Sequence, residues 1–370
     1  MREKIPQLYS IHIFRIVCAF AVFLFHSHIH VDVSYGVFNN FISQCHIFMV
    51  AFFMLSGFSL YYVDEERCRN MQITYMGGVK NFMFKRLVSV FPLYIAVWIL
   101  YAVWLFLKGQ LIPAWKHMVI APVELAMLQS VYDGSFGVLH NGGTWFISCI
   151  FICYLVYPYL RQVVHGNGLK SNIVLLAFCY CVSSYAFLPV YVFEFQDIYA
   201  NPFFRICEFL CGMLFAYFFE NRKERQCRVY KILVVPLLLM MLVLGITVGV
   251  HFGIRIVSAY NFVAVPIFGF TLYFCARIEW THKITRFRKL ISVLSENSYA
   301  FFLSQFFCFD ILKWLMNRTP FFSANGNMKK FFVSLSVACV MTAVLHYGIE
   351  NPAKAAMNKF KNNNRLGEKI

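Results

Sequence analysis

The sequence predicts an all-α polytopic integral membrane protein, a bundle of about ten transmembrane helices. Of its 370 residues, 60% are hydrophobic and 19% are aromatic, and the mean hydropathy is +0.63. Soluble globular domains have a far smaller apolar share. Apolar stretches long enough to cross about 30 Å of hydrocarbon recur along the whole chain. We expect spans near 8–29, 45–63, 88–107, 144–163, 172–190, 203–219, 232–250, 258–276, 291–314 and 330–349.

The first span carries two ionisable residues, Arg15 and His26. It is not expected to be a cleaved signal peptide, because Arg15 interrupts its apolar region and no small-residue cleavage site follows before His26. On a helix, His12, Arg15 and His26 share one stripe, and Arg15 lies about 16 Å from His26 along the axis. Charged residues in spans are costly, so the pair predicts a functional site. The alternative is that both side chains reach toward the two membrane interfaces.

The next three spans have polar or aromatic residues near their ends. Ser56 and Gly57 form a small step among aromatic residues, which predicts either a packing notch or part of a substrate site. Lys85 and Arg86 precede the third span, where they either anchor the helix or bind phosphates of a cytosolic donor. Trp145 opens the fourth span, and Trp at span ends usually belongs to an interfacial belt.

The segment 118–132 is apolar but short, and it contains Pro122 and Glu124. We expect it to be re-entrant or interfacial rather than a span.

Two later spans contain acid–base pairs at helical spacing. Arg205 and Glu208 are expected to pair on one helix face, either as a structural ion pair or as a carboxylate that orients a histidine. Asp310 and Lys313 are expected to form a structural pair.

The basic residues fall mostly on one side of the predicted topology. The net charge is +16, and most of the 33 Lys and Arg residues lie in the segments 2–4, 67–86, 161–170, 222–231, 277–289 and 354–369. The positive-inside rule therefore predicts that both termini are cytoplasmic. A basic surface beside anionic lipid explains the charge without a nucleic-acid partner. We expect one transmembrane domain over 1–355 and a basic cytoplasmic tail over 356–370.

The 13 cysteines lie mostly within spans and include no C-x-x-C motif. They are interpreted as buried apolar residues rather than disulfides or zinc ligands. No metal site is expected, and the histidines without ligand spacing are interpreted as solvated interfacial residues: His28, His30, His46 and His140.

An ordered set of landmarks carries a family resemblance. They are Arg15 with His26; FFMLSGF at 52–58; Lys85-Arg86 before Pro92-Leu93-Tyr94; Trp145-Phe146 with Tyr154 and Pro158; Arg205, Glu208 and Gly212; and Glu350-Asn351-Pro352. Together they resemble the integral-membrane acyltransferase 3 family, whose first helix carries an Arg and a His at this spacing. The chain departs from the family at Ser89, where an Arg is common, and at Gln305, where a His is common. The region around Trp145 looks like the branch that modifies cell-surface polysaccharides.

The resemblance implies transfer of an acyl group, most often acetyl, from cytosolic acyl-CoA to a hydroxyl of a cell-surface or lipid-linked glycan. It also implies a multi-pass protein of the bacterial inner (plasma) membrane, with no permanently bound cofactor. We assign His26 as general base, with Arg15 and Glu208 as further catalytic residues. Donor binding is assigned to Arg15, Lys85 and Arg86, and acceptor binding to Ser56, Trp145 and Arg205.

Two other classes compete with this interpretation. Intramembrane charges within about ten helices also suit a transporter or flippase for a glycan or small solute, although no inverted repeat is visible. A membrane scaffold for glycan assembly is the third possibility, and it would tolerate loss of both Arg15 and His26.

Overall fold

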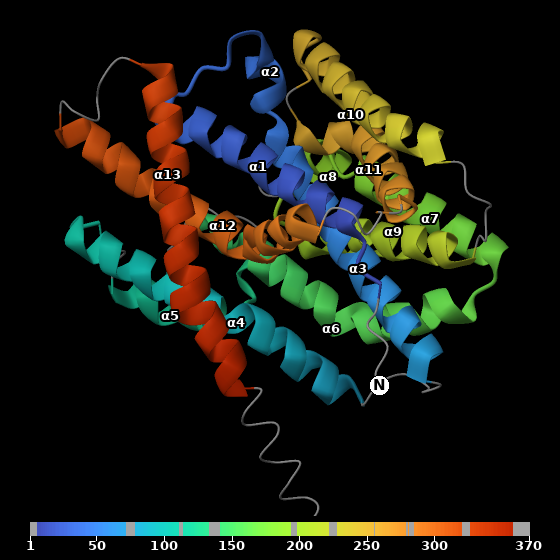
Figure 1. Cartoon of the computed structure of the whole chain (residues 1–370). Helices are drawn as coiled ribbons and strands as arrows, with labels where there is room; N and C mark the ends of the chain where they lie inside the picture. The colour runs from blue at the N-terminus through green and yellow to red at the C-terminus, as the bar shows by residue number, and fades with distance from the viewer. Residues whose placement is uncertain are drawn as a thin grey trace, which may run out of the picture.

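The computed structural model describes residues 6–71, 78–110, 114–132, 141–193, 198–221, 228–254, 256–278, 280, 285–319 and 326–357. Helices make up nearly all of these residues, and no strand occurs among them (Figure 1). The tail predicted at 356–370 falls outside the described residues after 357, and so does His140.

Nine of the described helices are long and apolar enough to cross a membrane. They contain α1 (Tyr9–Val31), α3 (Phe48–Met71), α4 (Gly78–Leu107), α6 (Trp145–Gly166), α9 (Pro202–Asn221), α10 (Arg228–His251), α11 (Asn261–Ala276), α12 (Thr285–Arg318) and α13 (Asn327–Leu345). Three shorter helices are α2 (Asn39–Ile42), α5 (Ala114–Leu125) and α8 (Leu188–Phe193). The polytopic helical bundle predicted from hydropathy is confirmed.

The span expected at 172–190 differs from the prediction in its length. The helix α7 covers only Leu169–Ser184, and α8 follows after a turn. Residues 185–187 form the turn between the two helices, and Pro189 is the second residue of α8, where its missing backbone N–H is tolerated. The short α7 still extends from the level where α6 ends to the first half of α9. Asn172 donates to the Val164 carbonyl near the end of α6 (2.8 Å), and Ser183 donates to Glu208 in α9 (3.3 Å).

Both ends of the described chain meet at one side of the bundle. Arg15, near the start of α1, lines the same cavity as Glu350 and Lys354, which follow α13.

The segment 118–132 forms α5 and a short 3-10 turn rather than a long helix. Glu124 is fully buried. Its carboxylate accepts from the Trp98 Nε1–H (2.7 Å), and its backbone carbonyl accepts from the Tyr94 hydroxyl (2.6 Å). With 12 residues, α5 is too short to span hydrocarbon, and these bonds hold it against α4.

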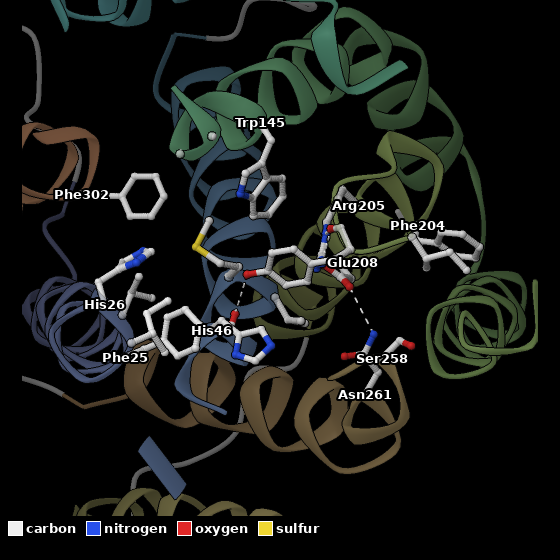
Figure 2. A pocket seen from close by; sticks show the side chains of 18 of the residues that line it. Phe25, His26, His46, Trp145, Phe204, Arg205, Glu208, Ser258, Asn261 and Phe302 are labelled. Carbon is white, nitrogen blue, oxygen red and sulfur yellow. Dashed lines mark hydrogen bonds and ion pairs between the residues drawn. The ribbon is translucent and has the colours of Figure 1, made fainter. Parts of the chain in front are cut away.

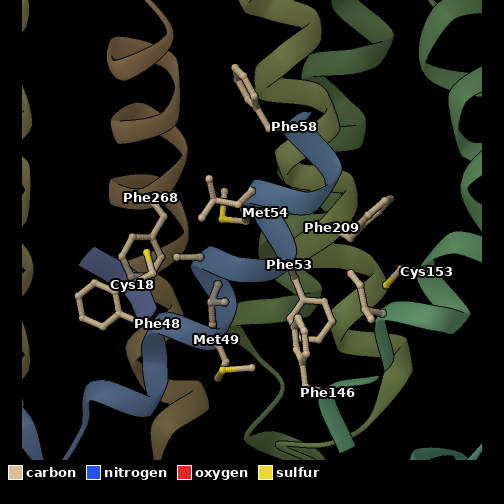
Figure 3. Close-up of a cluster of buried hydrophobic side chains, with 14 of the residues drawn as sticks. Cys18, Phe48, Met49, Phe53, Met54, Phe58, Phe146, Cys153, Phe209 and Phe268 are labelled. Carbon is tan, nitrogen blue, oxygen red and sulfur yellow. The ribbon is translucent and has the colours of Figure 1, made fainter. Parts of the chain in front are cut away.

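The centre of the bundle is the crossing of α3 and α9, where Met54, Phe58 and Phe209 pack (Figure 3). A Cβ on Gly57 would overlap the Phe209 backbone, and a Cβ on Gly212 would overlap the Met54 backbone. Small residues let helix backbones approach this closely. Gly57 is therefore a packing notch, whereas its neighbour Ser56 lines a cavity.

We expect Gly212→Ala to destabilise the protein by about 1–3 kcal/mol, because the added methyl group must push α3 and α9 apart. The matched control is Gly348→Ala, since nothing lies within 4 Å of a Cβ built on that glycine. Thermal unfolding in detergent measures both variants. Equal melting temperatures for the two would contradict the close crossing.

Candidate active site

A cavity of about 570 Å³ lies at the end of α1. His26 lines it, and we call it the His26 cavity. Figure 2 shows His26 and Phe302 on one side and the side chains of Arg205 and Glu208 on the opposite side. Residues near the beginnings of α3, α6 and α9 also line the cavity. The beginnings of these three helices therefore lie at the level where α1 ends.

His26 is held by aromatic neighbours rather than by hydrogen bonds. Its ring meets Phe25 edge-on with centroids 5.2 Å apart, and it lies parallel to the His30 ring at 5.5 Å. The buried Nδ1 atom has no hydrogen-bond partner within the described residues. Buried polar atoms are normally satisfied, so an unpartnered Nδ1 is unusual for a histidine whose ring lines a cavity.

The opposite wall contains the predicted Arg205/Glu208 pair, and the structure confirms its geometry. Arg205 Nη1 donates to Glu208 Oε2 at 2.7 Å, with side chains 5% and 1% exposed. The other carboxylate oxygen lies 3.3 Å from the Ser183 hydroxyl and 3.4 Å from the Asn261 amide nitrogen. Both oxygens of Glu208 are therefore engaged, and within the described part of the chain no hydrogen bond links it to His26.

Arg205 is enclosed on all sides. Its guanidinium carbon lies 4.8 Å from the Tyr199 ring centroid, 5.4 Å from Trp145 and 5.5 Å from Phe53. It also donates two hydrogen bonds to the Tyr199 carbonyl, at 2.9 and 2.6 Å. A guanidinium with this many partners positions the cavity wall and leaves little capacity to bind acceptor directly.

Two histidines expected to be solvated belong instead to this cavity. His30 and His46 both line it, and each has a buried ring nitrogen without a partner among the described residues. The expectation of solvated side chains was wrong because it placed both residues outside the bundle or at its outer surface. His30 lies in the last turn of α1, and the Tyr199 hydroxyl donates to the His46 carbonyl at 3.1 Å, tying this segment to the wall. His28 does not line the cavity; its Nδ1 lies 2.8 Å from the Val33 carbonyl.

A second cavity of about 380 Å³ lies toward the start of α1. Arg15 lines it, and we call it the Arg15 cavity. Its polar lining includes three basic side chains and two acidic ones: Arg15, Arg86 and Lys354 with Glu296 and Glu350. Serines add hydroxyls from several elements: Ser56, Ser59, Ser89, Ser295 and Ser298.

The two arginines of this cavity have no carboxylate partner within the described residues. Arg15 Nη2 donates to the Ser59 hydroxyl at 3.4 Å, and Arg86 lies over the rings of Phe82 and Tyr154 at 5.4 and 5.7 Å. Glu350, by contrast, is held by His346 at 2.7 Å and by Lys354 at 2.5 Å. The cavity therefore offers two guanidinium groups that can bind an anion.

The predicted site residues thus divide into two groups. His26, Trp145, Arg205 and Glu208 line the His26 cavity, while Arg15, Arg86 and Ser56 line the Arg15 cavity. Lys85 is exposed and lines neither.

The acid–base pair expected on α12 differs from the prediction. Asp310 accepts from Lys108, which directly follows α4, at 2.9 Å. The Trp104 Nε1–H donates to the same carboxylate at 2.8 Å. The partner of Asp310 therefore comes from the residue after α4 rather than from Lys313 on its own helix, because α4 packs against α12.

Gln305 belongs to α12 and contacts α1 at Ala19, between Arg15 and His26. It is fully buried, and its Nε2 is 3.5 Å from the Ala19 carbonyl. Its Oε1 has no partner in the described part of the chain. The amide packs against the α1 backbone between Arg15 and His26.

The sequence interpretation missed residues that reach the cavities only through long-range contacts. Asn261 donates to both Ser183 and Glu208, and Tyr199 accepts from Arg205. The polar start of α11 was a signal for Asn261, but nothing local marked Tyr199.

The family model for an acyltransferase domain, acyltransferase 3, matches residues 8–349. The chain belongs to the acyltransferase 3 family. The resemblance drawn from the ordered landmarks is confirmed, and the match reaches every described span. Membership makes the chain a multi-pass membrane acyltransferase. No curated protein and no solved structure matches it.

Proposed function

We propose that this acyltransferase 3 protein moves an acyl group, preferentially acetyl, from cytosolic acyl-CoA to a hydroxyl of a cell-surface or lipid-linked glycan. One observation carries the proposal. The same helix, α1, presents Arg15 to a basic cavity at one end and His26 to a separate cavity at the other. A donor with phosphates and an acceptor with hydroxyls need two such environments.

The composition of the Arg15 cavity supports donor binding. Arg15 and Arg86 suit phosphate oxygens, and the serine hydroxyls suit the amides of a pantetheine arm. A volume of about 380 Å³ is at the small end for ligand pockets, so the thioester arm would enter and the nucleotide would remain outside. Positive residues near this side support a cytoplasmic location for it, with both termini there.

The position of His26 supports a general-base role, because its imidazole lines the cavity and forms no ion pair with Glu208 on the opposite wall. The imidazole takes the proton of the acceptor hydroxyl, and the oxygen attacks the thioester carbonyl carbon. The new C–O bond forms, the C–S bond breaks, and the thiolate takes the proton back from the imidazolium to leave as CoA thiol. The histidine is restored, and no other reactant is consumed. In this scheme the Arg205/Glu208 pair positions the wall and does not bond to His26.

We further propose that the protein acts in a bacterial plasma membrane, with the bilayer and the glycan as its partners. A transporter or flippase that lacks acyl-transfer chemistry is the competing function, because two cavities also suit alternating access.

Acetyl-CoA labelled in its acetyl group tests the proposal directly. Membranes that contain the protein should transfer label to the cell's own surface glycan and release an equal amount of CoA thiol, whereas membranes without it should do neither. Glycan movement across the membrane with no release of thiol would support the transporter instead.

A further inference from the structure

One aromatic residue separates the two cavities. Phe302, on α12, lines both the His26 cavity and the Arg15 cavity, and it is the one residue shared by their described linings. Its side chain is 9% exposed. The two cavities therefore meet at this ring.

Two further rings complete the separation. The Phe302 centroid lies 5.2 Å from Phe146 and 5.9 Å from Phe52, and the last two lie 6.2 Å apart. All three pairs are within the range of aromatic contact. The rings come from α12, α6 and α3, so three helices meet at this point. We call these three residues the aromatic barrier.

Residues next to the aromatic barrier line the His26 cavity on one side and the Arg15 cavity on the other. Trp145, next to Phe146 in the chain, lines the His26 cavity, whereas Phe146 lines the Arg15 cavity. Ser56, one helical turn after Phe52, also lines the Arg15 cavity. Phenyl rings carry no hydrogen-bonding group, and a constriction made of them excludes water and ions.

A closed ring cluster of this kind can still admit a small apolar group. Phenyl side chains have a broad torsion about their last rotatable bond, so a modest rotation of Phe302 opens space beside it. A methyl group needs little of that space, and each added methylene needs more. Apolar sites discriminate one methylene by about 10- to 200-fold.

We propose that the aromatic barrier is the place where the acyl end of the donor's thioester arm reaches the His26 cavity, with the C–S bond intact until the acceptor oxygen attacks, and that Phe302 sets the upper limit on acyl size. The proposal rests on the acyl-transfer function proposed above and adds the residue that determines donor specificity. Phe302 acts through the space it occupies and is not a catalytic residue. The chemistry that it selects is a short, unbranched acyl thioester.

The test compares labelled acetyl-, propionyl- and butyryl-CoA as donors in membranes with wild type, Phe302→Ala, Phe302→Leu or Phe302→Trp. The readout is the ratio of butyryl to acetyl transfer, which does not depend on the amount of folded protein. We expect this ratio to rise about tenfold or more in the Ala variant, to rise less in the Leu variant, and to fall in the Trp variant.

The matched control is Phe307→Ala. Phe307 lies on the same helix and is 7% exposed, but it packs on Tyr101 and Trp104 and lines neither cavity. Its ratio should equal that of wild type. Unchanged ratios in every Phe302 variant would overturn the aromatic barrier while leaving acyl transfer intact. Absence of transfer from all three donors by wild type would instead overturn the function on which it rests.

Discussion

His26→Ala is expected to reduce acyl transfer by about 10²- to 10⁴-fold, the range that general-base catalysis supplies. The reason is that the carboxylate on the opposite wall cannot replace the base. His26 lies on the wall opposite Arg205 and Glu208 (Figure 2), and both oxygens of Glu208 are already engaged. The measurement is the initial rate of label transfer to glycan at equal protein levels.

The control for this prediction is His28→Ala on the same helix. His28 contacts the Val33 carbonyl and does not line the His26 cavity, so its loss should change the rate by little. A fold check by gel filtration in detergent accompanies both variants. Full transfer by His26→Ala would show that the base is another group, and His30 and His46 would then be the nearest candidates.

Hydropathy was sufficient to predict the bundle, because crossing about 30 Å of hydrocarbon demands long apolar helices whatever their packing. The span expected at 172–190 is divided in the structure, because residues 185–187 form a turn between α7 and α8. Helical periodicity also predicted the Arg205/Glu208 contact correctly, since residues three apart on a helix are neighbours. The same spacing failed for Asp310, whose partner Lys108 comes from a different part of the chain.

The division into two cavities was beyond the reach of sequence periodicity. Arg15 and His26 share a helix stripe, which suggests one site, but they line two different cavities. The rings of Phe52, Phe146 and Phe302 cluster where these cavities meet. Those rings come from three helices far apart in the chain. Helix packing in the membrane decides which side chains meet, and local sequence does not specify it.

The same argument explains His30 and His46. Both lie near span ends, where histidines are usually solvated, and only the tertiary structure shows that they line the His26 cavity. The arrangement gives one cavity three histidine rings and the other two arginines without carboxylate partners among the described residues. Arg15 and His26 therefore face different cavities from the two ends of α1.

The second large effect is expected from Arg205→Ala, which should destabilise the protein by about 3–5 kcal/mol. The variant leaves Glu208, 1% exposed, without its guanidinium partner. It also leaves the Tyr199 carbonyl without two donors and removes a cation from between three aromatic rings. Thermal unfolding in detergent measures the loss.

The double variant Arg205→Met/Glu208→Leu separates the ion pair from the rest of the wall. It removes both charges and fills similar volume, so it should be more stable than Arg205→Ala, because replacing a buried pair by apolar residues avoids an uncompensated charge. Glu208→Gln is the milder control, since the amide oxygen can still accept from Arg205. If Arg205→Ala melted like wild type, or if the double variant were no more stable than the single one, the buried pair would not be what holds this wall of the His26 cavity in place.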